Sequence, residues 1–310
     1  MMKKRFLSQS IQQWKTLQRS GRFFKPAPDH WGIRLFLSAF MGMFFWADSG
    51  LSTAAAQQTR IAIAVDPEGR SCLLGGGVDG KRLSADLISK LLKPRQDFRL
   101  FNLRGPQSTI LWPIGPPKRI EDNTCNPHFR QKLSLVPSEL GIAQIAIFDS
   151  LGGKNIAISP KTLTVMSNDD EKYTGVLASF LERQKLKDAP IKIHQLIRTD
   201  LDGDGKFEVI INAINTARNL DRKGEYSIVL VVREVDGKTE IETIQNEVTL
   251  EDSDYPAVLW ENTIAAIADI DGDGKMEIIM YGQFYHGQGW DLVKTGDGPA
   301  ERPIICGCGG

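Results

Sequence analysis

Two loops of this chain carry the same spacing of acidic side chains. Residues 200–211 read DLDGDGKFEVII, and residues 269–280 read DIDGDGKMEIIM. Carboxylates fall at loop positions 1, 3, 5 and 9, which are Asp200, Asp202, Asp204 and Glu208 in the first loop and Asp269, Asp271, Asp273 and Glu277 in the second. Four carboxylates so close together repel one another unless a cation lies among them. Calcium takes roughly six to eight oxygen ligands and tolerates irregular geometry, so the pattern predicts two calcium sites.

The residues around the acids indicate loops between strands. An EF-hand ends in a bidentate Glu at about position 12 and has a helix on each side. Position 12 here is Ile211 or Met280, and an apolar, β-rich segment follows each loop. A glycine at position 6 allows a sharp turn that directs the next backbone carbonyl to the same cation. The glycines are Gly205 and Gly274, and the carbonyls are those of Lys206 and Lys275. The alternative is an acidic surface turn without a metal, but two copies with the same spacing favour a bound ion.

The motif DxDGDGxxE followed by an apolar strand resembles the FG-GAP or VCBS-type repeat, the calcium loop of integrin-type β-propeller blades. The resemblance covers residues 191–289 and implies antiparallel strands joined by calcium loops. The chain departs from the family pattern because only two copies carry the acids. In addition, the stretch KMEIIMYGQFYHGQGW and the terminal CGCGG are similar to a group of exported bacterial proteins of unknown role.

The N-terminus has the features of a secretory signal peptide. Residues 1–34 hold eight basic residues and one acid, an apolar run follows at residues 35–47, and small residues end at Ala54, Ala55 and Ala56. A basic region, an apolar region of this length and an A-x-A site are typical of a cleaved leader. The alternative is an uncleaved anchor, but the run has 13 residues and a spanning helix needs about 20. We therefore expect residues 1–56 to be removed, a periplasmic or secreted protein, and no stable membrane span.

Removal of the leader changes the net charge. It takes away eight of the 38 basic and two of the 38 acidic residues, which leaves 30 against 36. A mildly acidic protein lacks the basic face that nucleic acid requires, so a nucleic-acid partner is not expected.

All four cysteines, Cys72, Cys125, Cys306 and Cys308, follow the predicted leader. An even number in an oxidising compartment indicates disulfides. Cys72 with Cys125 is the favoured pair, which leaves Cys306 and Cys308 bonded to each other or elsewhere. A redox role for these last two cysteines ranks below a structural one.

The sequence after the predicted leader indicates a mainly β (α+β) fold. We expect antiparallel sheets in a propeller-like or sandwich-like arrangement, with calcium loops between strands and one or two covering helices. We expect a β-rich domain at residues 57–165 and a domain with both calcium-loop repeats at residues 166–310. Helices are predicted after Ser84 and after residues 167–170. GGGVDGK at residues 75–81 lacks the Ser or Thr of a phosphate-binding loop. The VDGK at its end and the second VDGK at residues 235–238 both indicate tight turns.

No familiar catalytic motif is visible. One aromatic patch beside the second loop can stack on sugar rings, and its members are Tyr281, Tyr285, His286 and Trp290; the alternative is a hydrophobic plug that closes the last sheet. The favoured hypothesis is an exported, non-catalytic calcium-binding module that binds a glycan or an envelope protein. The alternatives are a calcium-dependent hydrolase or lyase acting on envelope or extracellular polymers, and a thiol-based redox protein.

Overall fold

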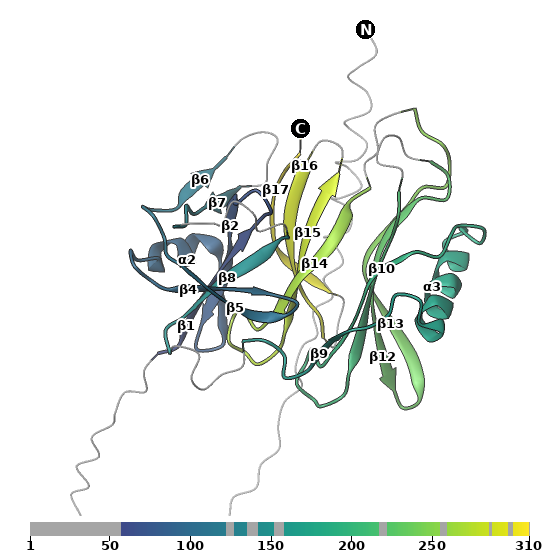
Figure 1. The fold of residues 1–310 in the computed structure, drawn as a ribbon, viewed down its shortest axis with the longest axis horizontal. Coiled ribbons are helices and arrows are strands. Elements are labelled where there is room, and N and C mark those ends of the chain that lie inside the picture. Colours follow the sequence, from purple (N-terminus) through teal and green to yellow (C-terminus); the bar gives the residue numbers. More distant parts are fainter. Residues whose placement is uncertain are drawn as a thin grey trace, which may run out of the picture. The chain divides into compact units, whose positions relative to one another are not determined.

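The structure, a computed structural model, describes residues 57–121, 127–134, 142–151, 158–216, 222–254, 259–284, 287–296 and 300–309. Residues 54–310 form one compact unit. Its strands make three larger antiparallel sheets and one small hairpin (Figure 1). The predicted leader lies outside the described residues.

The six-stranded sheet has the order β3-β2-β1-β8-β4-β5. Its strands are β1 (Thr59–Val65), β2 (Ser71–Val78), β3 (Lys81–Leu83), β4 (Phe98–Asn102), β5 (Gly105–Leu111) and β8 (Gln144–Asp149). Strands β6 (Lys118–Ile120) and β7 (His128–Arg130) form the small hairpin.

The five-stranded sheet has the order β13-β12-β11-β10-β9, and the four-stranded sheet has the order β14-β15-β16-β17. The five strands are β9 (Leu163–Val165), β10 (Ile193–Thr199), β11 (Glu208–Asn215), β12 (Tyr226–Val235) and β13 (Lys238–Val248). The four are β14 (Glu261–Ala268), β15 (Glu277–Phe284), β16 (Gly287–Lys294) and β17 (Glu301–Gly309). The division into domains at residue 165 stays a prediction, although β9 already pairs with β10.

The four-stranded sheet is apolar on both faces because it packs between the other two sheets. Side chains alternate along a strand, so Ile279 and Leu292 face the six-stranded sheet while Ile278 and Val293 face the five-stranded one. The contact with the six-stranded sheet uses small residues, namely Ala62 and Ala64 of β1 and Ala265, Ala266 and Ala268 of β14. Burial on both sides explains why these strands read as continuous apolar runs.

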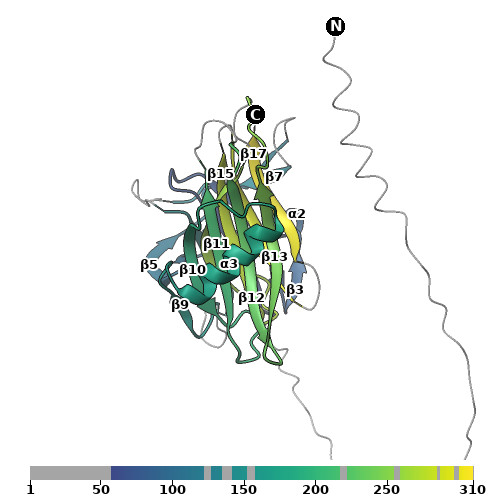
Figure 2. The ribbon, with the colours of Figure 1, turned by 90° about the vertical axis from the view of Figure 1, so that its right-hand side faces the viewer.

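A helix covers the outer face of each outer sheet. Helix α2 (Ala85–Leu91) places Ile88 in the cluster that contains Ile61 and Ile63 of β1. Helix α3 (Glu171–Arg183) packs Leu177 and Phe180 on the five-stranded sheet (Figure 2). The helices begin after the caps Ser84 and Asp170, whose side chains accept hydrogen bonds from the backbone N–H groups of Leu87 and Lys172. Both predicted helices are confirmed.

Both VDGK segments are hairpin turns, as predicted. Asp79 and Gly80 join β2 to β3 with φ values of 50° and 74°, and Asp236 and Gly237 join β12 to β13 with 50° and 73°. Two successive residues with positive φ make the type of turn that matches the twist of the strands.

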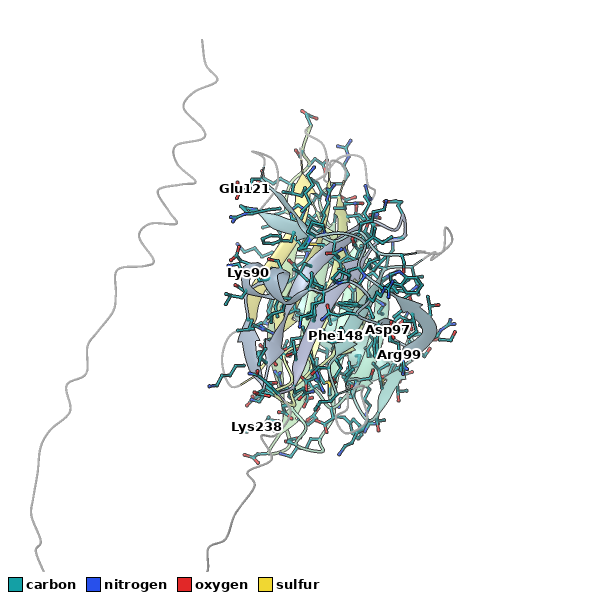
Figure 3. All side chains as sticks on the ribbon, turned by 90° about the vertical axis from the view of Figure 1, so that its left-hand side faces the viewer. Lys90, Asp97, Arg99, Glu121, Phe148 and Lys238 are labelled. Atoms are coloured by element: carbon teal, nitrogen blue, oxygen red, sulfur yellow. A yellow bond between two sulfur atoms is a disulfide. The ribbon has the colours of Figure 1, made fainter. Side chains whose placement is uncertain are left out.

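The surface carries charged side chains, whereas several aromatic side chains pack inside. Lys90 of α2 and Lys238 at the β12–β13 turn extend into solvent, while Phe148 of β8 packs on Phe98 with 5.8 Å between ring centroids (Figure 3). Among the described residues, neither helix is long and apolar enough to cross a membrane.

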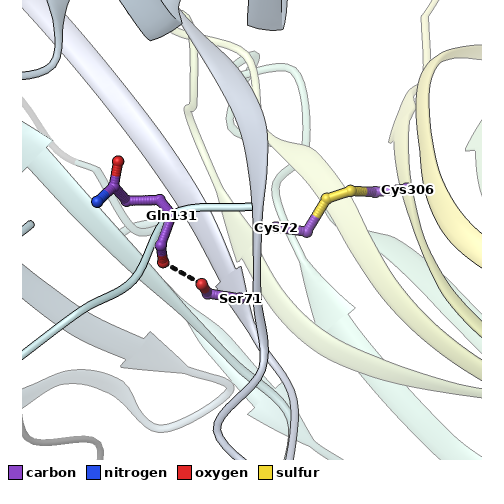
Figure 4. Close-up of a disulfide and its surroundings, with 4 residues drawn as sticks. All are labelled: Ser71, Cys72, Gln131 and Cys306. Atoms are coloured by element: carbon purple, nitrogen blue, oxygen red, sulfur yellow. Dashed lines mark hydrogen bonds between the residues drawn. A yellow bond between two sulfur atoms is a disulfide. The ribbon is translucent and has the colours of Figure 1, made fainter. Parts of the chain in front are cut away.

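The disulfide differs from the favoured pairing, because Cys72 of β2 bonds to Cys306 of β17 and not to Cys125 (Figure 4). Neighbouring residues of β2 face opposite ways. The Ser71 hydroxyl donates to the carbonyl of Gln131, next to β7, whereas Cys72 points into the core toward the four-stranded sheet. The segment that follows Cys125 therefore packs on the wrong face of β2 for a bond to Cys72. Cys125 and the side chain of Cys308 lie outside the described residues.

We expect the Cys72–Cys306 bond to be a structural staple, since both cysteines are buried and their bond closes a span of 234 residues. Peptide mapping without reduction should recover a peptide pair that joins these two cysteines. Reduction, or the double variant Cys72→Ala/Cys306→Ala, should lower the free energy of unfolding by about 2–4 kcal/mol, measured by urea denaturation. A mapped Cys72–Cys125 peptide would contradict the pairing.

Candidate metal centre

The first acidic loop joins β10 to β11, so it lies between strands as predicted. The Asp200 carboxylate accepts hydrogen bonds from the backbone N–H groups of Gly203 at 2.7 Å and Gly205 at 3.0 Å. Asp202 accepts from the N–H of Asp204 at 3.1 Å. Gly203 and Gly205 have φ values of 79° and 86°, a left-handed conformation that favours glycine. The backbone of the loop therefore turns around the carboxylates of Asp200 and Asp202 and donates hydrogen bonds to them.

The second loop joins β14 to β15 and has the same backbone geometry. Asp269 accepts from the N–H groups of Gly272 at 2.6 Å and Gly274 at 3.0 Å, and Asp271 accepts from the N–H of Asp273 at 3.3 Å. The local sequence dictates this shape, because the two loops agree in every one of these contacts.

The glutamate at position 9 closes each loop from the first residue of the outgoing strand. Glu208 accepts through Oε2 from the N–H of Leu201 at 2.7 Å, and Glu277 accepts in the same way from Ile270 at 2.7 Å. Glu208 is 4% exposed and Glu277 is fully buried. Burial raises the pKa of both carboxyl groups, and the charge of the neighbouring aspartates raises it further. A cation beside either carboxyl would lower its pKa again and favour the ionised form.

Both loops bring together carboxylates that could hold a metal ion. The two groups are Asp200, Asp202 and Glu208, and Asp269, Asp271 and Asp273, and within each group one oxygen per residue lies within 4.8 Å of the others. The predicted Asp204 and Glu277 stand outside these groups. Ligation by the carbonyls of Lys206 and Lys275 stays a prediction.

The two loops lie against each other and against the β2–β3 hairpin. The N–H of Met276 donates to the carbonyl of Leu201 at 2.7 Å, which joins the second loop to the first. On its other side, a Cβ placed on Gly77 of β2 would come within 2.0 Å of the carbonyl oxygen of Asp271. The second loop is thus wedged between the six-stranded sheet and the first loop.

The second loop is surrounded by basic side chains that the sequence pattern did not reveal. Arg60 of β1 contacts Asp269, with Nη1 at 2.8 Å from Oδ2 and 2.7 Å from the backbone carbonyl. Arg82 of β3 lies 2.8 Å from Glu277 Oε1 and 3.3 Å from Asp271 Oδ2.

Lys294 at the end of β16 contacts three acids of the same loop. Its Nζ lies 2.5 Å from Asp273, 3.4 Å from Asp271 and 3.9 Å from Glu277. The hydrogen bond from Lys294 helps to lower the pKa of Asp273 against the effect of burial. Lys294 stands opposite Glu277 in the register of β15 and β16.

The first loop has one ion pair among the described residues, from Lys206 to Asp204 at 3.5 Å, and Lys206 is largely exposed. Val232 pairs with Val209, so the next residue, Arg233, stands across from Glu208. Its guanidinium forms an ion pair with Glu242 at 2.5 Å, and its charge lowers the pKa of Glu208 without an ion-pair contact. The two loops share a sequence pattern but have different electrostatic surroundings.

The aromatic patch is part of the core where it is described. Tyr281 and Trp290 are each 5% exposed, and their ring centroids lie 5.0 Å apart. Their faces are therefore not a platform for a sugar ring, and their burial favours the hydrophobic plug. Tyr285 and His286 lie outside the described residues.

Comparison of the chain with protein-family models, with curated proteins and with solved structures finds no match in any of the three. The resemblance to FG-GAP or VCBS-type repeats therefore rests on the loop residues and their flanking strands.

The close approach at Gly77 makes a direct prediction about stability. Gly77→Ala should lower the free energy of unfolding by about 1–3 kcal/mol, because the methyl group must displace the backbone of the second loop. Gly175→Ala in α3 is the matched control, since nothing lies within 4 Å of its Cβ. It should be neutral or stabilising by roughly 0.5–1 kcal/mol through helix propensity. Urea denaturation gives the free energy of unfolding of both variants. Equal effects would contradict the close packing of the second loop against Gly77.

Proposed function

We propose that the protein is an exported, non-catalytic calcium-binding β module, in which a cation at the first loop organises the hairpin β10–β11. The observation that carries the proposal is Glu208, which is 4% exposed. One of its oxygens accepts from Leu201, and the other has no hydrogen bond or ion pair among the described residues. Moving a carboxylate out of water is costly, and a metal ion beside Asp200 and Asp202 would offset that cost.

The donor set favours calcium over transition metals and magnesium. The first loop offers carboxylate oxygens from Asp200, Asp202, Asp204 and Glu208 and a backbone carbonyl from Lys206. It holds no histidine or cysteine, the ligands that zinc and copper prefer. Magnesium requires near-ideal octahedral geometry, whereas a loop with one buried and two exposed acids supplies ligands of unequal freedom.

Export is supported by the leader-like N-terminus and by the buried Cys72–Cys306 bond, since disulfides persist in oxidising compartments. A periplasmic or secreted module of this kind would present its calcium-ordered loop to a glycan or a protein of the envelope.

Calcium should stabilise the folded protein. A ligand that binds only the native state adds about 2.7 kcal/mol at a hundred times its Kd, so the thermal midpoint should rise when calcium replaces a chelator. Asp202→Asn should remove most of this rise because it neutralises an exposed ligand. Asp236→Asn, in a turn outside the acidic groups, is the matched control and should keep it. Equal melting curves in calcium and chelator would overturn the proposal.

Calcium affinity should fall as the solution becomes acidic. Calcium binds the ionised carboxylate, and burial raises the pKa of Glu208, so protons compete at a higher pH than for an exposed glutamate of pKa about 4.3. Titration calorimetry should therefore give a weaker affinity at pH 5 than at pH 7. Glu208→Gln should bind more weakly at both values and show a smaller difference between them. An affinity independent of pH would contradict the role of Glu208.

A further inference from the structure

The second loop already contains positive charge at the positions where its carboxylates converge. Lys294 Nζ lies within 4 Å of Asp271, Asp273 and Glu277, and Arg82 bridges two of the same acids. Arg60 completes the set at Asp269, so each of the four acids has at least one cationic partner.

These cations are held in place by the fold. The Arg60 side chain is 1% exposed and also contacts Asp149 of β8 at 3.3 Å, which fixes its guanidinium between the six-stranded sheet and the loop. The side chains of Arg82 and Lys294 are 22% and 25% exposed. A divalent ion entering this loop would meet ammonium and guanidinium groups within hydrogen-bond distance of its ligands, and like charges at such distances repel strongly.

The first loop has none of this arrangement. Among the described residues, Asp200, Asp202 and Glu208 have no ion pair, and the base that stands across from Glu208, Arg233, is directed to Glu242. The four acids of the first loop have one exposed lysine in ion-pair contact, and the charge of Arg233 acts on Glu208 from a longer distance. The four acids of the second loop have three bases in ion-pair contact.

From this difference we propose that the second loop takes no metal ion. Arg60, Arg82 and Lys294 act as its cations and make it an ionic clasp between the six-stranded and four-stranded sheets, so that the protein binds one divalent ion, at the first loop. The inference rests on the proposed function, because it assigns the calcium to one of two loops with identical spacing.

The test is a count of calcium ions on the purified full chain. After dialysis against calcium chloride, metal analysis and titration calorimetry should give one ion for the wild type, none for Asp202→Asn and one for Asp271→Asn. Two ions, with one lost in each variant, would overturn the inference and leave the proposed function standing, as would one ion that Asp271→Asn alone removes. No ion on the wild type would overturn both.

Two further measurements separate a clasp from a metal site without depending on one variant. In chelator, Asp271→Asn should melt below the wild type while Asp202→Asn should melt with it, because only the clasp acts without metal. The double variant Arg82→Gln/Lys294→Gln removes two cations and keeps every acid, so it should gain a second calcium ion. A wild-type melting curve for Asp271→Asn in chelator would contradict the clasp, and a double variant that folds and still binds a single ion would contradict the role of the two bases.

Discussion

The structure depends on how positive charge reaches a set of buried carboxylates. Each acidic loop ends in a glutamate that the protein buries almost completely, and an isolated buried carboxylate is strongly disfavoured. The loops nevertheless adopt the same backbone, because their glycines and backbone N–H groups satisfy the first aspartate of each loop in the same way. The backbone cannot supply a counter-charge. In the second loop Arg60, Arg82 and Lys294 supply it, and for the first loop we propose a bound cation.

The contact between the second loop and the six-stranded sheet also explains residues far from the loops. Gly77 of β2 must be a glycine because any side chain there would clash with the carbonyl of Asp271. This close approach brings β1 and β3 near enough for Arg60 and Arg82 to reach acids about 200 residues away in the chain. Small alanine faces on β1 and β14 permit the same closeness over the rest of the contact. The ion pairs, the glycine and the alanines are therefore parts of one interface, and the Cys72–Cys306 bond fastens the same two sheets.

Features encoded over short stretches could be predicted from the sequence, and features set by distant partners could not. The VDGK turns, both helices with their caps and the position of the acidic loops between strands depend on neighbouring residues, and all were expected. The favoured bond between Cys72 and Cys125 was wrong because nothing in a single sequence shows which face of β2 meets which sheet. Likewise Arg60, Arg82 and Lys294 carry no local motif. The sequence offered Trp290 and Tyr281 as a patch that could stack on a sugar ring or as a hydrophobic plug, and only packing shows that they face inward.

A repeated motif is therefore weaker evidence for two equal sites than its spacing suggests. The spacing of DxDGDGxxE determines the backbone of the loop, and both copies share it. The carboxylates that cluster nevertheless differ, since Glu208 belongs to the first group and Asp273 to the second. The identity of the bound cation is determined by the free energy of every charge within a few ångströms, most of which other strands contribute. Unlike a metal ion, an arginine or lysine of the same chain loses no entropy of association when it contacts the carboxylates, and a chelator cannot remove it. Such a side chain therefore suits a loop at a sheet interface. A metal ion in a loop that faces solvent, as the first one does, would instead exchange with the surroundings, so the loop would respond to the calcium concentration there. On the assignment proposed above, burial of the second loop and exposure of the first would lead to different counter-ions for the same spacing of acids.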